Sequence, residues 1–231
     1  MQTIVFLTAA GMSAESGIST FRDSDGLWEN HSVEEVCTHE AWERQPAVVL
    51  DFYNMLRRKF KDCQPNEGHR LIASLQDKYR VRVVTQNVDN LHEQAGTQEV
   101  LHLHGELMKC RAEGRDNGRY YPLDPKDPDI HLGDHDPEGR QLRPHIVFFG
   151  EDVPNLSKAA EVMHTADIVV VIGTSLNVYP AAGLLRYAPA DAPVYLIDPK
   201  VVHSPYREVQ QIQKGASAGM RELCERLKAN A

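Results

Sequence analysis

The chain has 231 residues, of which 42% are hydrophobic and 25% are charged, and its formal net charge is −8. This size suits one large α/β domain, or one domain with a smaller insert, and no apolar stretch reaches the roughly 18 residues of a membrane-spanning helix. The negative charge argues against a protein that binds the phosphate backbone of nucleic acids. We therefore expect neither membrane nor nucleic acid among its partners.

The first predicted element, an apolar strand over residues 4–7, begins so close to Met1 that it leaves no room for a signal peptide, which predicts a cytoplasmic protein. The small residues Ala9, Ala10 and Gly11 follow the strand. A strand that leads through such a turn into a helix can hold a phosphate, because free N–H groups and the helix dipole meet there. An ordinary tight turn explains the same residues equally well, since the glycine spacing is not that of the dinucleotide motif G-x-G-x-x-G.

Helical patterns dominate the next part of the chain. Residues 21–28 are polar and read as a loop. Residues 39–62 have apolar side chains at helical spacing, and Pro46 suits the first position of a helix. A further helix is predicted after Pro65.

The strand predicted over residues 80–85 ends in polar residues, which include Gln86, Asn87 and Asp89. Open α/β sheets place their ligand-binding groups at this end of the strands. The polar run is therefore a second candidate for a ligand site.

The second half of the chain combines a loop-rich insert with strong strands. Residues 100–108 predict a short strand and a glycine turn, whereas residues 111–144 are rich in Gly, Pro, Asp and Arg and predict loops. Ordered structure returns at residues 145–151, and a helix is predicted near residues 156–165. The β-branched run at residues 167–173 predicts a strand buried on both faces, which is typical of a parallel sheet.

A strand over residues 194–197, which ends at Asp198, and a helix near residues 217–228 complete the pattern. Strands that alternate with helices indicate an α/β fold with a Rossmann-like, doubly wound parallel sheet. Small or polar groups follow four of the strands, at residues 8–13, 86–89, 173–175 and 198. Such a sheet gathers these groups along one edge, where dinucleotides bind, and this favours a nucleotide site at the first turn.

A series of motifs in this order resembles those of the sirtuins, which are NAD-dependent protein lysine deacylases. The motifs lie at residues 9–22, 86–89, 104–107, 149–151 and 173–175. Further residues are similar to the bacterial branch of the family that is related to desuccinylases, namely residues 26–28, 52–53 and 142–145.

The resemblance implies a Rossmann NAD-binding domain with a smaller inserted domain. The first would comprise residues 1–27, 70–107 and 145–231, and the second residues 28–69 and 108–144. It also implies a reaction in which the oxygen of an acyl-lysine attacks the ribose of NAD with loss of nicotinamide. The acyl group then passes to the ribose, which gives O-acyl-ADP-ribose and free lysine.

The resemblance also assigns roles to residues. His104 would be the general base that takes a proton from a ribose hydroxyl, a task that suits an imidazole, and Asn87 would be the second catalytic residue. The residues that would bind NAD are Ala9, Ala10, Gly11, Ser13, Glu15, Phe21, Arg22, Gln86, Asn87, Asp89, Gly173, Thr174, Ser175, Asp198 and Ala216. The residues that would bind the acylated peptide are Tyr53, Arg57, Phe149, Gly150 and Val178.

Each of these residues also has a purely structural interpretation. Without the family, His104 reads as a structural histidine just as well, and Asn87 and Asp89 read as caps of a helix that starts near Val88. Arg22 suits a surface ion pair, and Phe149 suits core packing.

The chain departs from the family at the first turn and in the second insert. Ala9 stands where sirtuins usually have glycine, and Cys110 is the one cysteine in the insert, where most sirtuins carry four zinc ligands. His131 and His135 offer a metal site with Cys110, but a solvated acidic loop explains them more simply. We therefore predict a zinc-free small domain with no metal.

The acyl pocket shows a further departure. Desuccinylases carry a Tyr-x-x-Arg motif that binds an acidic acyl group, whereas here Tyr53 is followed by Leu56 at the third position and by Arg57 at the fourth. Arg57 either reaches the acyl carboxylate or is an ordinary arginine, and Leu56 makes the pocket more apolar. The sequence thus leaves deacetylation and desuccinylation open.

Two other functions suit the same residues. The first is mono-ADP-ribosyl transfer or NAD hydrolysis on the same fold, and the second is a non-catalytic NAD-sensing module. The set of Gln86, Asn87, Asp89 and His104 argues against the module, and Tyr53 with an apolar peptide cleft favours deacylation. We expect acylated lysine side chains of proteins as partners of a monomer.

Overall fold

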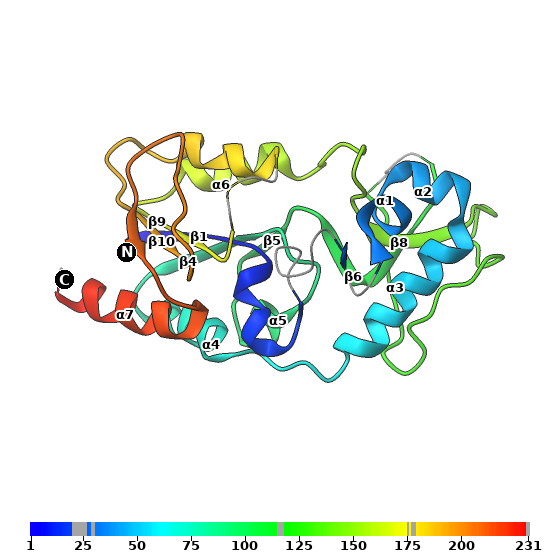
Figure 1. Ribbon diagram of the computed structural model, residues 1–231, viewed down its shortest axis with the longest axis horizontal. Helices are drawn as coiled ribbons and strands as arrows, with labels where there is room; N and C mark the ends of the chain where they lie inside the picture. The colour runs from blue at the N-terminus through cyan, green and yellow to red at the C-terminus, as the bar shows by residue number, and fades with distance from the viewer. Residues whose placement is uncertain (20–26, 29–30, 115–117, 175, 177–178, 230–231) are drawn as a thin grey trace. The chain divides into compact units, whose positions relative to one another are not determined.

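The computed structural model describes residues 1–19, 27–28, 31–114, 118–174, 176 and 179–229 (Figure 1). The chain divides into two compact units. The larger unit comprises Met1–Thr20, Gln64–Leu103 and Val153–Ala231, and the smaller unit comprises Phe21–Cys63 and His104–Asp152. None of the described helices is both long and apolar enough to cross a membrane.

The larger unit is built on a six-stranded sheet in which every pairing is parallel. Its strands, in spatial order, are β11 (Gln210–Ile212), β10 (Val194–Ile197), β9 (Ile168–Ile172), β1 (Thr3–Thr8), β4 (Arg80–Thr85) and β5 (Val100–His102). All five residues of β9 are buried, as its β-branched sequence predicts for a central parallel strand. The predicted α/β fold with a doubly wound parallel sheet is confirmed.

Helices lie over both faces of this sheet (Figure 1), and apolar side chains join them to it. One layer joins α6 (Leu156–His164) and a 3-10 helix, Ala181–Tyr187, to one face. The other joins α4 (Glu67–Ser74) and α7 (Ala216–Ala229) to the opposite face. The short helix α5 (Leu91–Gln94) follows β4. Sequence patterns gave no indication of β11 or of the 3-10 helix, which are both short.

The smaller unit combines helices with two antiparallel sheets. Its helices are α1 (Val33–Val36), α2 (His39–Arg44) and α3 (Pro46–Phe60). A three-stranded sheet has the order β7 (Tyr121–Pro122), β6 (Gly105–Ala112), β8 (Leu142–Ile146), and β2 (Leu27–Trp28) pairs with β3 (His31–Ser32).

The predicted helical segment over residues 39–62 contains two helices, and the second begins at Pro46, as predicted. Gln45 has non-helical dihedral angles (φ −146°, ψ 62°), and Pro46 occupies the first turn of α3. Proline has no N–H group and so cannot continue the hydrogen bonds of a preceding helix, which explains the break. The unit boundary also differs from the predicted domain boundary at residue 145, because β8 pairs with β6 and lies wholly in the smaller unit.

The helix α7 packs tightly on β10 at Gly219. A Cβ atom added to this glycine would lie 2.2 Å from Cγ2 of Ile197, which is 1% exposed at the end of β10. The absence of a side chain therefore allows the helix to approach the sheet.

We predict that Gly219→Ala lowers the free energy of unfolding by about 1–3 kcal/mol, because the added methyl group overpacks the contact with Ile197. A glycine-to-alanine change inside a helix normally stabilises by about 1 kcal/mol, so the expected sign is reversed. Urea unfolding monitored by circular dichroism measures the change, with Ala218→Gly as a control for helix propensity. A more stable Gly219→Ala protein would contradict the observed packing.

Candidate active site

The order of the strands creates a switch point beside β1. From β1 the chain proceeds to β4 and β5 on one side, and later to β9, β10 and β11 on the other. Because all strands are parallel, their carboxyl ends share one edge of the sheet. Ligands of such sheets bind in the crevice where the strand order reverses, which here lies between β1 and β9.

Two glycines meet at this switch point. The N–H of Gly11, after β1, donates to the carbonyl oxygen of Gly173, after β9, over 3.0 Å. A Cβ atom on Gly11 would lie 2.6 Å from Cα of Gly173, and Gly173 has a φ of +67° that side chains other than glycine rarely adopt. Both positions therefore require glycine, and together they fix the path of both turns.

Three polar side chains from the turns after β1 and β4 form a hydrogen-bonded set. The Nδ2 group of Asn87 donates to the carbonyl oxygen of Ala9 and to Oγ of Ser13, each over 3.1 Å. The hydroxyl of Ser13 in turn donates to Oδ2 of Asp89 over 2.9 Å. The turn after β1 and the turn after β4 are thus joined by the residues that the sequence analysis selected.

Asp89 also has a structural task. Its Oδ1 atom accepts the N–H of Leu91, the first residue of α5, over 3.1 Å. Burial raises the pKa of the Asp89 carboxyl, and the hydrogen bonds from Leu91 and Ser13 only partly offset this effect. The interpretation of Asp89 as a helix cap and its place in the polar set are therefore compatible.

A buried histidine fixes the backbone of this turn. Nδ1 of His102 lies 2.8 Å from the carbonyl oxygen of Asn87, and Nε2 lies 2.8 Å from Oε1 of Glu93. Both ring nitrogens thus lie at hydrogen-bond distance from an oxygen acceptor. His102 thus holds Asn87 in position.

Two further buried histidines, which no sequence pattern indicated, lie near this turn. Nε2 of His92 lies 3.1 Å from Oγ1 of Thr8, and the rings of His92 and His69 are 4.8 Å apart in an edge-to-face arrangement. Burial lowers the pKa of His69 to about 4 and that of His92 well below its usual value. One ring nitrogen of each has no hydrogen-bond partner among the described residues. Their only sequence signal is a histidine among apolar neighbours on a helix.

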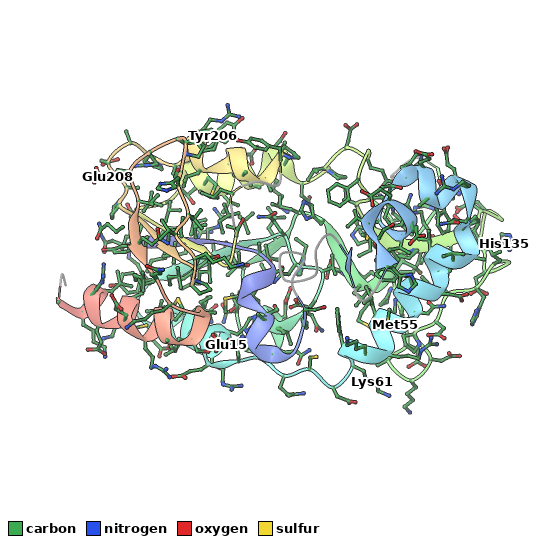
Figure 2. The ribbon with its side chains drawn as sticks, viewed as in Figure 1. Glu15, Met55, Lys61, His135, Tyr206 and Glu208 are labelled. Atoms are coloured by element: carbon green, nitrogen blue, oxygen red, sulfur yellow. The ribbon has the colours of Figure 1, made fainter. Side chains whose placement is uncertain are left out.

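The other predicted NAD contacts of the larger unit are placed around the same edge. Oε1 of Glu15 accepts the N–H of Ser217 over 3.1 Å, so this carboxylate lies beside the first turn of α7, which begins at Ala216 (Figure 2). Asp198 is buried directly after β10, and its Oδ1 accepts the N–H of Lys200 over 2.9 Å. The remaining members are Ala10, which begins a 3-10 turn, the half-buried Gln86, and the buried Thr174, whose Oγ1 accepts the N–H of Leu176.

The larger unit therefore fits a dinucleotide. The two glycines keep side chains out of the switch point, and the buried Asp198 carboxylate stands at the neighbouring strand end, where a ribose diol is bound in such folds. Phe21, Arg22, Ser175 and Val178 lie outside the described residues.

Predicted catalytic and substrate residues also lie in the smaller unit. His104, its first residue after the larger unit's strand β5, is half-buried, and its carbonyl oxygen accepts the N–H of Val147 over 3.0 Å. Tyr53 is buried and donates to Sγ of Cys37 over 3.8 Å.

Arg57 is 1% exposed and is therefore not a surface arginine. Its Nε donates to the carbonyl oxygen of Leu107 over 2.8 Å, and its Nη1 donates to Oδ1 of Asn54 over 2.6 Å. Its Nη2 is buried without a partner in the described part of the chain. Two of the three guanidinium nitrogens thus serve the structure of the smaller unit.

The potential metal ligands of the second insert do not form a cluster among the described residues. Cys110 is buried, and burial raises the pKa of its thiol. Asp134 accepts the N–H of His131 over 2.7 Å, which is a contact within the loop.

Comparison with known proteins identifies related chains over nearly the whole length. The model of the Sir2 family matches residues 9–180. An NAD-dependent protein deacylase of Bacteroides thetaiotaomicron is 52% identical over 226 residues, which cover 96% of this chain and 97% of the relative. One of Helicobacter pylori, with the same name, is 47% identical and covers 98% of both chains.

Solved structures agree with this relationship. The crystal structure of a Sir2 homolog–NAD complex has a TM-score of 0.85 and 35% identity, and the match covers 99% of this chain and 90% of that one. The structure of Sir2Tm bound to a propionylated peptide has a TM-score of 0.78 and 26% identity, with 98% and 93% covered.

We predict that Asp89→Asn stabilises the protein at neutral pH. The folded state raises the pKa of this carboxyl, so its ionisation costs stability as the pH rises above the ordinary aspartate value of about 3.9. Asparagine removes this cost, and the gain should vanish in acid. Thermal unfolding at pH 4 to 8 measures the effect, with the exposed Asp191→Asn as a control that leaves the profile unchanged. Equal or lower stability of Asp89→Asn at pH 7 would contradict the prediction.

We predict that His69 makes the protein sensitive to acid. Its pKa falls from 6.5 to about 4 on folding, so its contribution to stability is complete above pH 6.5 and is lost as the pH drops toward 4. The difference corresponds to about 3 kcal/mol. In His69→Asn, the amide oxygen takes the place of Nδ1 as acceptor for the N–H of Asn66.

Urea unfolding between pH 7 and 4 should show a shallower loss for His69→Asn than for the wild-type protein. The exposed His203 provides the matched control, and His203→Asn should follow the wild-type curve. Parallel curves for His69→Asn and wild type would show that this histidine does not set the acid sensitivity.

Proposed function

This chain belongs to the Sir2 family, and we propose that it removes acyl groups from lysine side chains of proteins with NAD as cosubstrate. The observation that carries the proposal is the set of Ser13, Asn87 and Asp89, which joins the turns after β1 and β4 at the carboxyl edge of the sheet. Serine, amide and carboxylate groups at this edge suit the ribose and the carboxamide of NAD. The raised pKa of the buried Asp89 carboxyl is typical of functional sites and supports a catalytic role over a non-catalytic module.

Residues of the larger unit would hold NAD. Asn87 and Asp89 would bind the nicotinamide part, Thr174 and Asp198 the phosphate and ribose parts, and the loop of Ala9 and the residues after it would approach the dinucleotide closely. Bound NAD supplies an activated glycosidic bond at the anomeric carbon of its ribose. His104 would take the proton of a ribose hydroxyl at an imidazole nitrogen, which makes that oxygen a better nucleophile.

The acylated peptide would bind at Phe149 and Gly150. The backbone N–H of Phe149 donates to Cys37 over 2.8 Å, and its carbonyl oxygen accepts from His39 over 2.9 Å. The side chain of Phe149, which is 51% exposed, is therefore the part of this residue that would contact a peptide. Neighbouring residues would have to supply any backbone hydrogen bonds to the peptide.

We further propose that the enzyme prefers neutral acyl groups, although several of its motifs resemble those of the branch related to desuccinylases. Leu56 stands where that branch carries arginine, and Arg57 is committed to Leu107 and Asn54. An acidic acyl group would thus lack the two-pronged guanidinium contact that stabilises a carboxylate.

The smaller unit would be stable without zinc. The side chain of Asn54 makes two hydrogen bonds to the backbone of Ile130, at 2.9 and 3.0 Å. Asp136, whose carboxyl pKa is lowered to about 2, accepts from the backbone N–H groups of Glu138 and Arg140 and from the guanidinium of Arg140, although its burial opposes this shift. Side chains thereby anchor the loop that zinc ligands would anchor in most sirtuins. The net charge of −8 supports the absence of nucleic-acid partners.

Product analysis with NAD and a series of lysine peptides tests the function. The peptides are unmodified, acetylated, long-chain acylated and succinylated. We expect free lysine peptide and O-acyl-ADP-ribose from the neutral acyl peptides, and at least a 100-fold loss of turnover in His104→Ala, which is the rough value of a general base.

Two outcomes would overturn parts of the proposal. Consumption of NAD without any acyl peptide, or ADP-ribose attached to protein, would establish the hydrolase or transferase instead. A strong preference for succinyl peptide would mean that Nη2 of Arg57 reaches the acyl carboxylate. His203→Asn serves as a histidine control outside the site.

A further inference from the structure

The segment proposed to bind the peptide is a tight turn. The N–H of Glu151 donates to the carbonyl oxygen of Phe148 over 3.0 Å, and Gly150 has a φ of +91°. A glycine with positive φ at the third position is the signature of a type II turn. The turn is therefore well defined, and its three residues other than Gly150 carry large or charged side chains.

The carboxylate of Glu151 adds a second hydrogen bond between the last and the first residue of this turn. Its Oε2 accepts the N–H of Phe148 over 2.9 Å, so the side chain of the last residue bonds the backbone of the first. The backbone of Phe149 is held from the other side, where it bridges Cys37 and His39. Together these bonds leave the turn little freedom.

Three basic side chains in turn hold the Glu151 carboxylate. Arg143 contacts both oxygens, with Nη1 at 2.6 Å and Nη2 at 3.2 Å, and Arg111 contacts Oε2 at 3.2 Å. Nδ1 of His39 lies 3.1 Å from Oε1. Burial acts to raise the pKa of Glu151, but the bonds from Arg143 and its neighbours outweigh it, and the pKa is lowered.

The arginine is itself fixed. Arg143 is 3% exposed, its guanidinium lies 4.1 Å from the centre of the Phe148 ring, and its Nη2 also donates to the carbonyl oxygen of Ile146. A stacked guanidinium with a two-pronged carboxylate contact has one geometry rather than many. Arg143, which lies on strand β8, therefore fixes the position of the turn through its contact with Glu151.

We propose that Glu151 is a positioning residue for substrate, which holds the Phe149–Gly150 turn in the conformation that receives the acylated peptide. The inference rests on the proposed function, because it assumes that this turn is the peptide site. Glu151 acts through the turn and does not touch the reacting atoms. Loss of its charge should weaken peptide binding and leave the chemistry and the use of NAD intact.

The test is Glu151→Gln, in which the amide keeps the shape of the side chain but presents an N–H group to donors. We expect the KM for acetylated peptide to rise by roughly tenfold or more, with kcat and the KM for NAD within about twofold of wild type. Glu40→Gln, an exposed carboxylate on α2 that pairs only with Arg44 in the described part of the chain, is the matched control and should change none of the three.

The outcomes separate the two proposals. Wild-type protein that converts no acylated peptide would refute the proposed function itself. If wild type is active and Glu151→Gln has an unchanged KM for peptide, or loses kcat and NAD affinity in parallel, the positioning role is refuted. Should Glu151→Gln fail to fold, as judged by circular dichroism, Arg143→Lys decides by the same readouts, since it keeps the charge and loses the two-pronged contact.

Discussion

The contact between Gly11 and Gly173 is the constraint on which the larger unit depends. The turns after β1 and β9 cross so closely that a Cβ atom on either glycine would lie within 2.6 Å of the other's backbone. This crossing directs the chain after β1 over the carboxyl end of β4, where Ser13 reaches Asn87 and Asp89. A wider crossing would separate these side chains, and the edge of the sheet would then be an ordinary surface.

The same edge contains groups that work against folding. The Asp89 carboxyl is disfavoured in its charged form, and His69 and His92 each bury a ring nitrogen without a partner in the described residues. Unsatisfied buried groups of this kind cost about 1–3 kcal/mol each. The apolar layers on both faces of the sheet offset these costs.

The loops of the smaller unit are stabilised in a different way, because they have little apolar core of their own. These loops are held in part by polar side chains that bond to backbone groups, as Asn54 does with Ile130 and Glu151 does with Phe148. Such bonds are short-ranged and directional, so they fix the path of a loop more closely than apolar contacts do. Buried Arg57 belongs to this scheme, which explains why a cation beside the predicted acyl pocket can be structural.

Contacts that follow from the direction of the strands can be predicted from the sequence. Ser13 and Asp89 are 76 residues apart, yet their proximity follows from parallel strands whose polar ends must share an edge. The pairing of His69 with His92 could not be predicted in this way, because it depends on how α4 and α5 pack, and a histidine on a short helix has the same pattern whether it is buried or exposed. The break at Gln45 lies between these cases, since Pro46 marks it locally but the apolar spacing continues across it. Prediction from sequence therefore succeeds where covalent geometry and strand direction decide the contact, and it fails where two side chains meet only through the packing of separate helices.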